Sequence, residues 1–171
     1  LVSKNQYARV FIVHRLDKDT SGIVLFAKNE KIKEILQSKW NDITTRIYYA
    51  VVEGKTKEKD VLKSYLKEDK TLKTYVATSG DLAITKYELI KSNAHNSLLK
   101  IEIKTGRKNQ IRVHMQDNKT PILGDKKYGK KDGYRKMMLL ANKLEFIHPI
   151  TKQNLNIDIG IPQEYKSIIR K

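Results

Sequence analysis

The chain has 171 residues, of which 39% are hydrophobic and 32% charged, and this composition favours one soluble domain with a single core. Its 35 lysine and arginine residues outnumber 19 aspartate and glutamate residues, and the formal net charge of +16 is typical of a protein that binds nucleic acid. The absence of cysteine excludes disulfide bonds, cysteine zinc sites and thiol catalysis. No apolar run approaches the roughly 18 residues of a membrane span and no signal peptide is visible, so we expect a cytoplasmic protein.

The N-terminal part predicts two strands and a helix around a polar loop. Residues 10–13 and 23–27 are rich in β-branched and aromatic side chains, which is typical of strands. The loop between them ends on Thr-Ser-Gly, a tight-turn sequence in which Gly22 supplies backbone freedom. Residues 30–40 have the apolar spacing of a helix, with Asn29 as its N-cap.

The middle of the chain predicts a series of strands separated by lysine-rich turns. These strands cover residues 44–53, 60–66, 73–78, 83–90 and 97–103. The last strand alternates apolar and polar residues, which indicates one buried face. A break at residues 105–108 then precedes a predicted helix over residues 109–116.

The C-terminal part predicts a long loop, two strands and a closing helix. The loop covers residues 117–136, and a loop of this length in a small domain is usually functional or mobile. Strands are predicted over residues 137–146 and 154–161, and Pro162 begins a helix over residues 163–170. Strands dominate this order, so we expect a single α+β domain with a mostly antiparallel, mixed sheet and a few helices.

Asp17 is the first candidate for chemistry. It lies in the polar sequence H-R-L-D-K-D-T-S-G at residues 14–22, between the first two predicted strands. A carboxylate on a short loop that two strands hold is well placed for catalysis. Loops of this kind are also common where no chemistry occurs, so the local pattern leaves both interpretations open.

Two further segments carry polar residues that a core does not need. Tyr48 and Tyr49 must point to opposite faces of their strand, so that one can line a cleft, although two tyrosines at a sheet edge would give the same pattern. Arg107 and Lys108 precede a helix, where cations oppose the helix dipole. A phosphate or carboxylate held at that helix terminus would explain them; a solvated basic face is the alternative. Arg112 has no acidic partner at helical spacing and is free to bind one elsewhere.

The sequence predicts no metal site and no cofactor site. The four histidines are His14, His95, His114 and His148, and no two of them have the spacing of metal ligands on one element. No phosphate-binding loop or dinucleotide fingerprint is present.

Taken together, these segments resemble the RluA-type family of RNA pseudouridine synthases. The family's signature segments correspond, in order, to residues 14–22, 46–54, 105–115, 121–129 and 144–149. They match its catalytic motif H-R-L-D-x-x-T-S-G, its tyrosine motif, T-G-R-x-H-Q-I-R-x-H, a PI-GD-YG segment and L-x-F-x-H-P. The agreement runs from about residue 8 to residue 165, and it implies the pseudouridine synthase catalytic fold.

The resemblance implies an isomerase that converts specific uridines in structured RNA to pseudouridine without a metal or cofactor. It implies Asp17 as the nucleophile, acting on the uracil ring or on the ribose, with Arg112 beside it to lower its pKa by roughly 1–3 units. Tyr48 would stack on the uracil and handle the C5 proton. Contacts to RNA are assigned to Arg15, Lys18, Thr20, Arg107, Lys108, Gln110, His114, Lys126 and Lys127, with the lysine cluster of residues 126–136.

The sequence departs from the family pattern at two kinds of position. Asn109 stands where the family usually has His, and Leu140 where a His often precedes Ala141. Family members normally carry an upstream strand with a Lys-Pro motif, often behind an S4-type RNA-binding domain. Neither is present in residues 1–171, which begin with Leu1 rather than Met, so we expect a catalytic domain that is a fragment of a longer protein.

Large-subunit ribosomal RNA is the substrate that the resemblance favours, with transfer RNA as the alternative, and we expect a monomer. Two other functions compete with it. One is a non-catalytic RNA-binding or ribosome-assembly protein, for which the charge alone suffices. The other is a nuclease that uses Asp17 or Asp19 with His14 on a metal. A general preference for lysine in the source's proteins would explain the charge without any nucleic acid.

Overall fold

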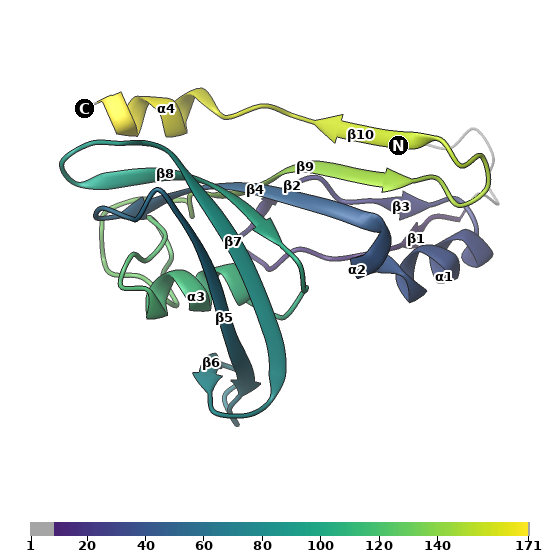
Figure 1. Cartoon of the computed structure of the whole chain (residues 1–171), viewed down its shortest axis with the longest axis horizontal. Coiled ribbons are helices and arrows are strands. Elements are labelled where there is room, and N and C mark those ends of the chain that lie inside the picture. The colour runs from purple at the N-terminus through teal and green to yellow at the C-terminus, as the bar shows by residue number, and fades with distance from the viewer. Residues whose placement is uncertain (1–8, 171) are drawn as a thin grey trace.

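The computed structural model describes residues 9–170. The elements are β1 (Phe11–Ile12), β2 (Ser21–Gly22), β3 (Phe26–Ala27), α1 (Glu30–Ser38), α2 (Trp40–Ile43), β4 (Thr44–Glu53), β5 (Lys59–Glu68), β6 (Thr74–Ala77), β7 (Asp81–Ser92), β8 (Asn96–Ile103), α3 (Gln110–Asp117), β9 (Leu139–Ile147), β10 (Asn154–Asp158) and α4 (Gln163–Arg170). Figure 1 shows α3 and α4 on opposite sides of the sheet, with α1 and α2 beside β1 and β3.

One large sheet organises the chain. Its strands follow the order β10-β9-β4-β8-β7-β5-β6, and all neighbours in this order are antiparallel. β2 adds to β9 in parallel, and β1 pairs with β3 in a separate two-stranded sheet. The mostly antiparallel, mixed α+β architecture predicted from the sequence is therefore confirmed.

The core lies where β4, β8 and β9 meet the two helices α3 and α4. Ala50, Val51 and Leu99 are fully buried there, and Ile111 and Met115 bring one face of α3 against them. Burying each large apolar side chain of this kind stabilises a fold by about 1.5–3 kcal/mol. This packing fixes the start of α3 relative to β4, and both contribute to the site described below.

β5 and β7 are longer than predicted and form an arm beyond the body of the sheet. Figure 1 shows this arm projecting on the side of α3, with β6 at its far end. The exposed lysines of β5 interrupt its apolar pattern, but Lys59 to Leu66 still pair in register with Glu88 to Asp81 of β7. Backbone pairing thus extends the strands past the residues whose side chains are apolar.

The N-terminal region differs from the prediction in detail. The predicted strands at residues 10–13 and 23–27 shorten to β1 and β3, and the expected turn at Gly22 instead pairs with β9. Gly22 has φ +130°, and a Cβ there would lie 2.2 Å from the Ala141 carbonyl oxygen, so only glycine fits this close approach. The predicted N-cap is confirmed, since Asn29 Oδ1 accepts the Ile32 N–H at 2.9 Å.

The predicted helix over residues 30–40 ends earlier, at Ser38, and a short second helix, α2, follows it. Among residues 9–170, no helix combines the length and the apolar character that a membrane crossing requires.

Candidate active site

A cavity of about 360 Å³ opens where four parts of the fold meet. They are the loop after β1, the α1–α2 corner, the first half of β4, and the turn that leads into α3. Its lining includes Asp17, Tyr48, Thr20, Arg15, His14, Trp40, Arg46, Gly106, Arg107 and Gln110. The size falls in the range of small-ligand pockets, and residues from three of the family-like segments line it.

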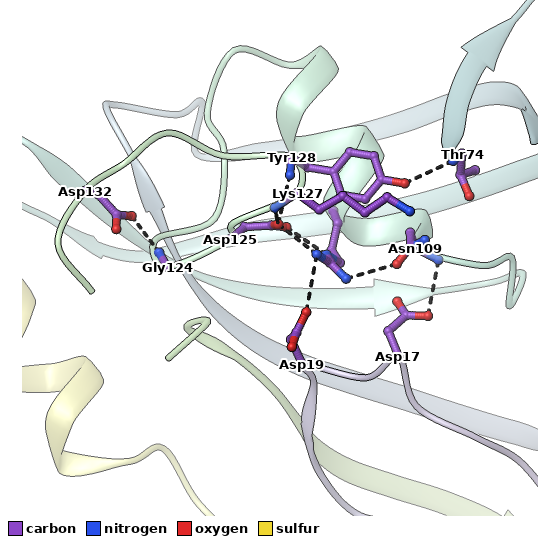
Figure 2. Close-up of polar contacts among 10 residues, drawn as sticks. Asp17, Asp19, Thr74, Asn109, Gly124, Asp125, Lys127, Tyr128 and Asp132 are labelled. Atoms are coloured by element: carbon purple, nitrogen blue, oxygen red, sulfur yellow. Dashed lines mark hydrogen bonds and ion pairs between the residues drawn. The ribbon is translucent and has the colours of Figure 1, made fainter. Parts of the chain in front are cut away.

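Asp17 lies at the N-terminus of α3. Its Oδ1 accepts a hydrogen bond from the backbone N–H of Asn109 at 3.4 Å, and the turn holding it is closed by the Thr20 N–H on the Asp17 carbonyl oxygen at 2.9 Å. Asn109 has φ +54°, a left-handed conformation that asparagine tolerates better than most residues, and this conformation turns its N–H toward the carboxylate. Figure 2 shows this contact. A carboxylate thus lies at the helix terminus, as the two preceding cations suggested.

The pKa of Asp17 is raised above its ordinary value, because burial disfavours the charged form more than its surroundings favour it. The Asn109 N–H and the positive charges of Arg112, Arg15 and Lys108 oppose the increase. The predicted net decrease in the pKa of Asp17 is therefore wrong. The sequence shows the cations but not how much solvent the fold removes from the carboxylate.

Tyr48 lines the same cavity from β4, where it is nearly fully buried. β4 lies between β8 and β9, so the interpretation as an edge-strand tyrosine pair is wrong. The pairing of β4 with β9 shifts register between Ile47 and Tyr48. Burial raises the pKa of Tyr48 to about 12, so the phenol stays protonated at neutral pH.

Arg112 is held by Asp125 rather than by Asp17. Its Nε and Nη2 donate to the two carboxylate oxygens of Asp125, each at 2.8 Å, and its Nη1 donates to Asn109 Oδ1 at 3.0 Å. Asp19 lies 3.8 Å from Nη2. Within residues 9–170, Arg112 and Asp17 form no direct ion pair, which corrects the prediction that they are partners. Asn109 lies between them and contacts both.

The loop after α3 builds the support for Arg112. Burial raises the pKa of Asp125, but hydrogen bonds from Arg112 and from the N–H groups of Tyr128 and Lys127 outweigh burial and lower it overall. The Tyr128 ring lies 5.1 Å from the Arg112 guanidinium, and its hydroxyl accepts the Thr74 N–H at 3.0 Å. Figure 2 shows this chain of contacts from β6 to Asp17. The motif at residues 121–129 includes Asp125, but nothing in the sequence indicates that Asp125 is the partner of Arg112.

Six of the predicted RNA contacts are exposed cations: Arg15, Lys18, Arg107, Lys108, Lys126 and Lys127. Arg107 pairs with Asp81 at 3.5 Å and Lys108 with Glu68 at 2.5 Å, both across to the arm. Lys127 Nζ donates to the Leu72 carbonyl oxygen at 3.1 Å. These cations remain accessible to a polyanion, and surface pairs of this kind exchange partners at little cost.

The remaining predicted contacts are not exposed. His114 is buried with its two ring nitrogens on Ser64 and Thr85, at 2.9 and 2.8 Å, so it is a structural residue and not an RNA contact. Gln110 lines the cavity, but both atoms of its amide group bond within the protein, for example to Arg107 N at 3.0 Å and Ile84 O at 3.0 Å. Thr20 is half-buried in the cavity wall. The sequence places these three in motifs but does not show which way they point.

His14 and Trp40 form one wall of the cavity. Their rings stack with centroids 4.6 Å apart, and His14 Nε2 accepts the Leu25 N–H at 3.1 Å. Burial lowers the pKa of His14, so the imidazole is neutral near pH 7. Within the part of the chain that the structure describes, no group of three or more histidine or acidic side chains is arranged to hold a metal ion.

Comparison with known proteins connects this site to a family. The model for RNA pseudouridylate synthase matches residues 1–117, more than half of the chain. The chain belongs to the RNA pseudouridylate synthase family. Several relatives are named ribosomal large subunit pseudouridine synthase C or D, and the chain is an RluA-type member of the family. The resemblance predicted from the sequence motifs is confirmed.

Two relatives illustrate the match. The uncharacterized RNA pseudouridine synthase YhcT of Bacillus subtilis is 36% identical over 168 residues, covering 92% of this chain and 55% of its own. Ribosomal large subunit pseudouridine synthase D of Borreliella burgdorferi is 40% identical over 142 residues, covering 78% of this chain and 44% of its own. The chain spans about half the length of the curated relatives it matches.

A solved structure agrees on the fold. Human RNA pseudouridylate synthase domain containing 1 superposes with a TM-score of 0.79 at 20% identity, covering 90% of this chain and 70% of the human chain. The predicted pseudouridine synthase fold is thereby confirmed.

Proposed function

We propose that this family member isomerises uridine to pseudouridine in structured RNA, with Asp17 as the nucleophile. The position of the Asp17 carboxylate is the observation that supports this function most strongly. It lies in a cavity of nucleotide size, oriented by the Asn109 N–H, with the Tyr48 ring in the same cavity. Family membership and the surplus positive charge support RNA as the substrate.

The reaction needs no external reactant. The N1–C1′ bond of uridine breaks, the base turns, and a C5–C1′ bond forms, while the C5 proton is lost and N1 gains one. Asp17 assists by forming a temporary bond, either to C1′ of the ribose or to the uracil ring, and it leaves again as a carboxylate. Because the proton lost from C5 is balanced by the one gained at N1 and no atom changes its overall oxidation level, neither a redox cofactor nor a phosphate donor is required.

Asp17 must be ionised to act as a nucleophile. Burial works against this, and the Asn109 N–H together with the charges of Arg112, Arg15 and Lys108 works for it. Arg112 thus acts on Asp17 through space and through Asn109, with Asp125 fixing its position. We propose that Asn109 and Asp125 are positioning residues for this purpose.

Tyr48 is better suited to stacking than to removing a proton. A group with a pKa of about 12 holds its own proton at neutral pH and is then no base. We therefore assign Tyr48 to the face of the uracil ring. In the ribose route, Asp17 is released as a carboxylate when the C5–C1′ bond forms and then accepts the C5 proton. In the ring route, loss of the C5 proton to solvent expels the Asp17 carboxylate from the ring.

The target uridine must leave its base stack to reach Asp17, which costs a few kcal/mol and costs least in a loop or bulge. Exposed cations around the cavity and on the loop after α3 offset this cost by binding phosphates, so affinity should fall steeply with salt. Large-subunit ribosomal RNA is the proposed substrate, because it appears in the names of several relatives. Transfer RNA is the alternative.

Release of tritium from RNA labelled at uracil C5 tests the proposed reaction, since every turnover frees that hydrogen. We expect release that persists in EDTA and leaves the RNA uncut. RNA cleavage that EDTA stops would support the nuclease instead, and binding without release from ribosomal or transfer RNA would support a binding protein. Pseudouridine mapping in cells that lack the gene, followed by rescue, then identifies the target uridine; rescue of a ribosomal site is the expected result.

A further inference from the structure

Arg46 is a buried cation without an acidic partner. Its side chain lies at the start of β4 and is only 6% exposed. Its Nη2 donates to Asn41 Oδ1 at 2.9 Å and to the Lys104 carbonyl oxygen at 3.3 Å, and its Nε bonds to no atom in the described chain. Among residues 9–170, no carboxylate lies within 4.0 Å of it.

This arrangement is unfavourable for the free protein. A buried charge normally has an opposite charge beside it, because removal from water is costly and two neutral acceptors return only part of the lost hydration. Burial also lowers the pKa of Arg46, although arginine stays charged near neutral pH. An anion that arrives from outside would supply the missing partner.

The position of Arg46 makes the cavity the place for that anion. Arg46 and Tyr48 are two residues apart on β4, so both point to the same face, and both line the catalytic cavity. The opposite wall leaves room for the guanidinium, since a Cβ on Gly106 would lie 2.9 Å from Arg46 Nη1. The absence of a side chain at Gly106 is therefore explained by the space that the Arg46 guanidinium occupies, and not by the backbone conformation of the turn.

We propose that Arg46 binds a phosphodiester group next to the target uridine inside the cavity. This inference rests on the proposed RNA substrate, in which phosphates are the only groups that carry a full negative charge near neutral pH. Nη1 donates no hydrogen bond within the described residues and can reach a phosphate oxygen, while Nε is buried and without a partner in the free protein. Such a contact fixes the backbone of the flipped nucleotide, so that the base alone moves while C1′ stays near Asp17.

A chemical double-mutant cycle tests the contact. The probes are RNA hairpins with a single uridine in the loop, carrying either natural linkages or one uncharged methylphosphonate on the 5′ or the 3′ side of that uridine. Binding is measured by fluorescence anisotropy for the full chain and for Arg46→Met. We expect one of the two methylphosphonates, and Arg46→Met, each to weaken binding about 10- to 100-fold, whereas the two changes together weaken it little more than one alone.

Salt dependence separates a phosphate contact from a structural role. Loss of one phosphate contact should reduce the slope of log affinity against log salt by about 0.7, whereas a general loosening of the cavity would not change the slope by one contact. Lys166→Met on α4 removes an equal charge from an exposed position and serves as the control. Arg46→Lys should recover part of the affinity, because it restores the charge without the fork.

Additive effects of the methylphosphonate and Arg46→Met, at both linkages, would overturn the proposal. The natural hairpin and the two methylphosphonate hairpins are also compared on the unmutated protein, so the test remains possible if Arg46→Met fails to fold. Equal affinity of the unmutated protein for these three hairpins would overturn the proposal. Coupling in the cycle without any tritium release would leave Arg46 as a phosphate ligand and reject the isomerase. Tritium release without coupling would reject Arg46 alone.

Discussion

Two buried arginines lie close to the same cavity, and only one of them has a carboxylate partner among the described residues. Arg112 has a carboxylate at 2.8 Å on two of its nitrogens, an asparagine on the third and an aromatic ring on its face. Arg46 has two neutral acceptors on one nitrogen and no carboxylate among the described residues. The paired arginine is part of the structure of the site, and the unpaired one is ready for a ligand.

The fold gives a counter-charge to the arginine nearer Asp17 and none to the arginine in the cavity wall. Asp125 binds Arg112 at two nitrogens and so holds it away from Asp17, whose carboxylate, among residues 9–170, accepts a hydrogen bond from the Asn109 N–H alone, at 3.4 Å. A nucleophile in a tight ion pair would lose reactivity, so this spacing suits catalysis. The groups assigned to function, Asp17 and Arg46, are therefore those whose charge has no full counter-charge in the free protein.

The largest change in stability should come from breaking the ion pair between Arg112 and Asp125. Asp125→Asn leaves the Arg112 guanidinium buried without its counter-charge, and we expect a loss of about 3–5 kcal/mol in the free energy of unfolding in urea. Asp19→Asn removes a carboxylate 3.8 Å from the same arginine but 56% exposed, and should cost less than about 1 kcal/mol. Equal losses in the two variants would contradict the account.

His114 shows a third way to bury a basic group, which is to leave it uncharged. Burial lowers its pKa to about 4, whereas in the unfolded chain it is near 6.5. The unfolded state therefore binds more protons between these values, so stability is fully present above pH 6.5 and falls as pH drops toward 4. We expect this to contribute up to about 3 kcal/mol, measured by urea unfolding across that range. His114→Asn should remove this part of the pH dependence; an unchanged profile would contradict it.

Removal of the unpaired arginine should barely affect stability. Arg46→Met gives up two hydrogen bonds and also an uncompensated buried charge, so we expect a change within about 1 kcal/mol of zero in either direction. Arg112→Met, by contrast, should lose several kcal/mol because Asp125 is left alone. The same unfolding measurement compares the two, and a loss at Arg46 as large as at Arg112 would make both arginines structural.

The smallest effect concerns the acid side of the pH profile. Activity should fall as pH drops through the raised pKa of Asp17, because the carboxylate must be ionised. Lys108→Met removes one of the charges that oppose this increase, so the pKa rises further and the acid limb of kcat/KM for tritium release moves to higher pH. Lys166→Met should leave the limb in place. A shift to lower pH in Lys108→Met would be inconsistent with this electrostatic account.

Local patterns predicted much of the fold and some of the site. The bounds of β4 and α4 agree with the prediction because apolar spacing, Gly54 and Pro162 mark them in the sequence. β2 was expected to be a turn, because its pairing partner Ala141 lies far along the chain. The sequence placed Asp17 and Tyr48 in motifs that the fold does bring together.

Partners and orientations were harder to predict from the sequence. Asp125 lies in a loop whose path depends on tertiary packing, so the sequence does not show that it binds Arg112. His114 belongs to a motif yet points into the arm, and no sequence period shows that direction. Asn109 looked like a minor departure from the family pattern, but its left-handed backbone carries the contact to Asp17.

Tritium release from C5-labelled RNA by matched variants shows whether Asp17 is the nucleophile of the isomerisation. Asp17→Asn keeps the shape of the side chain and its contact with Asn109 but removes the negative charge. We predict that this variant binds RNA nearly as well as the unmutated chain and releases no tritium, whereas Asp19→Asn, two residues away, keeps release within about tenfold of the unmutated rate, or about 1.4 kcal/mol. Release by Asp17→Asn at the unmutated rate would contradict the account.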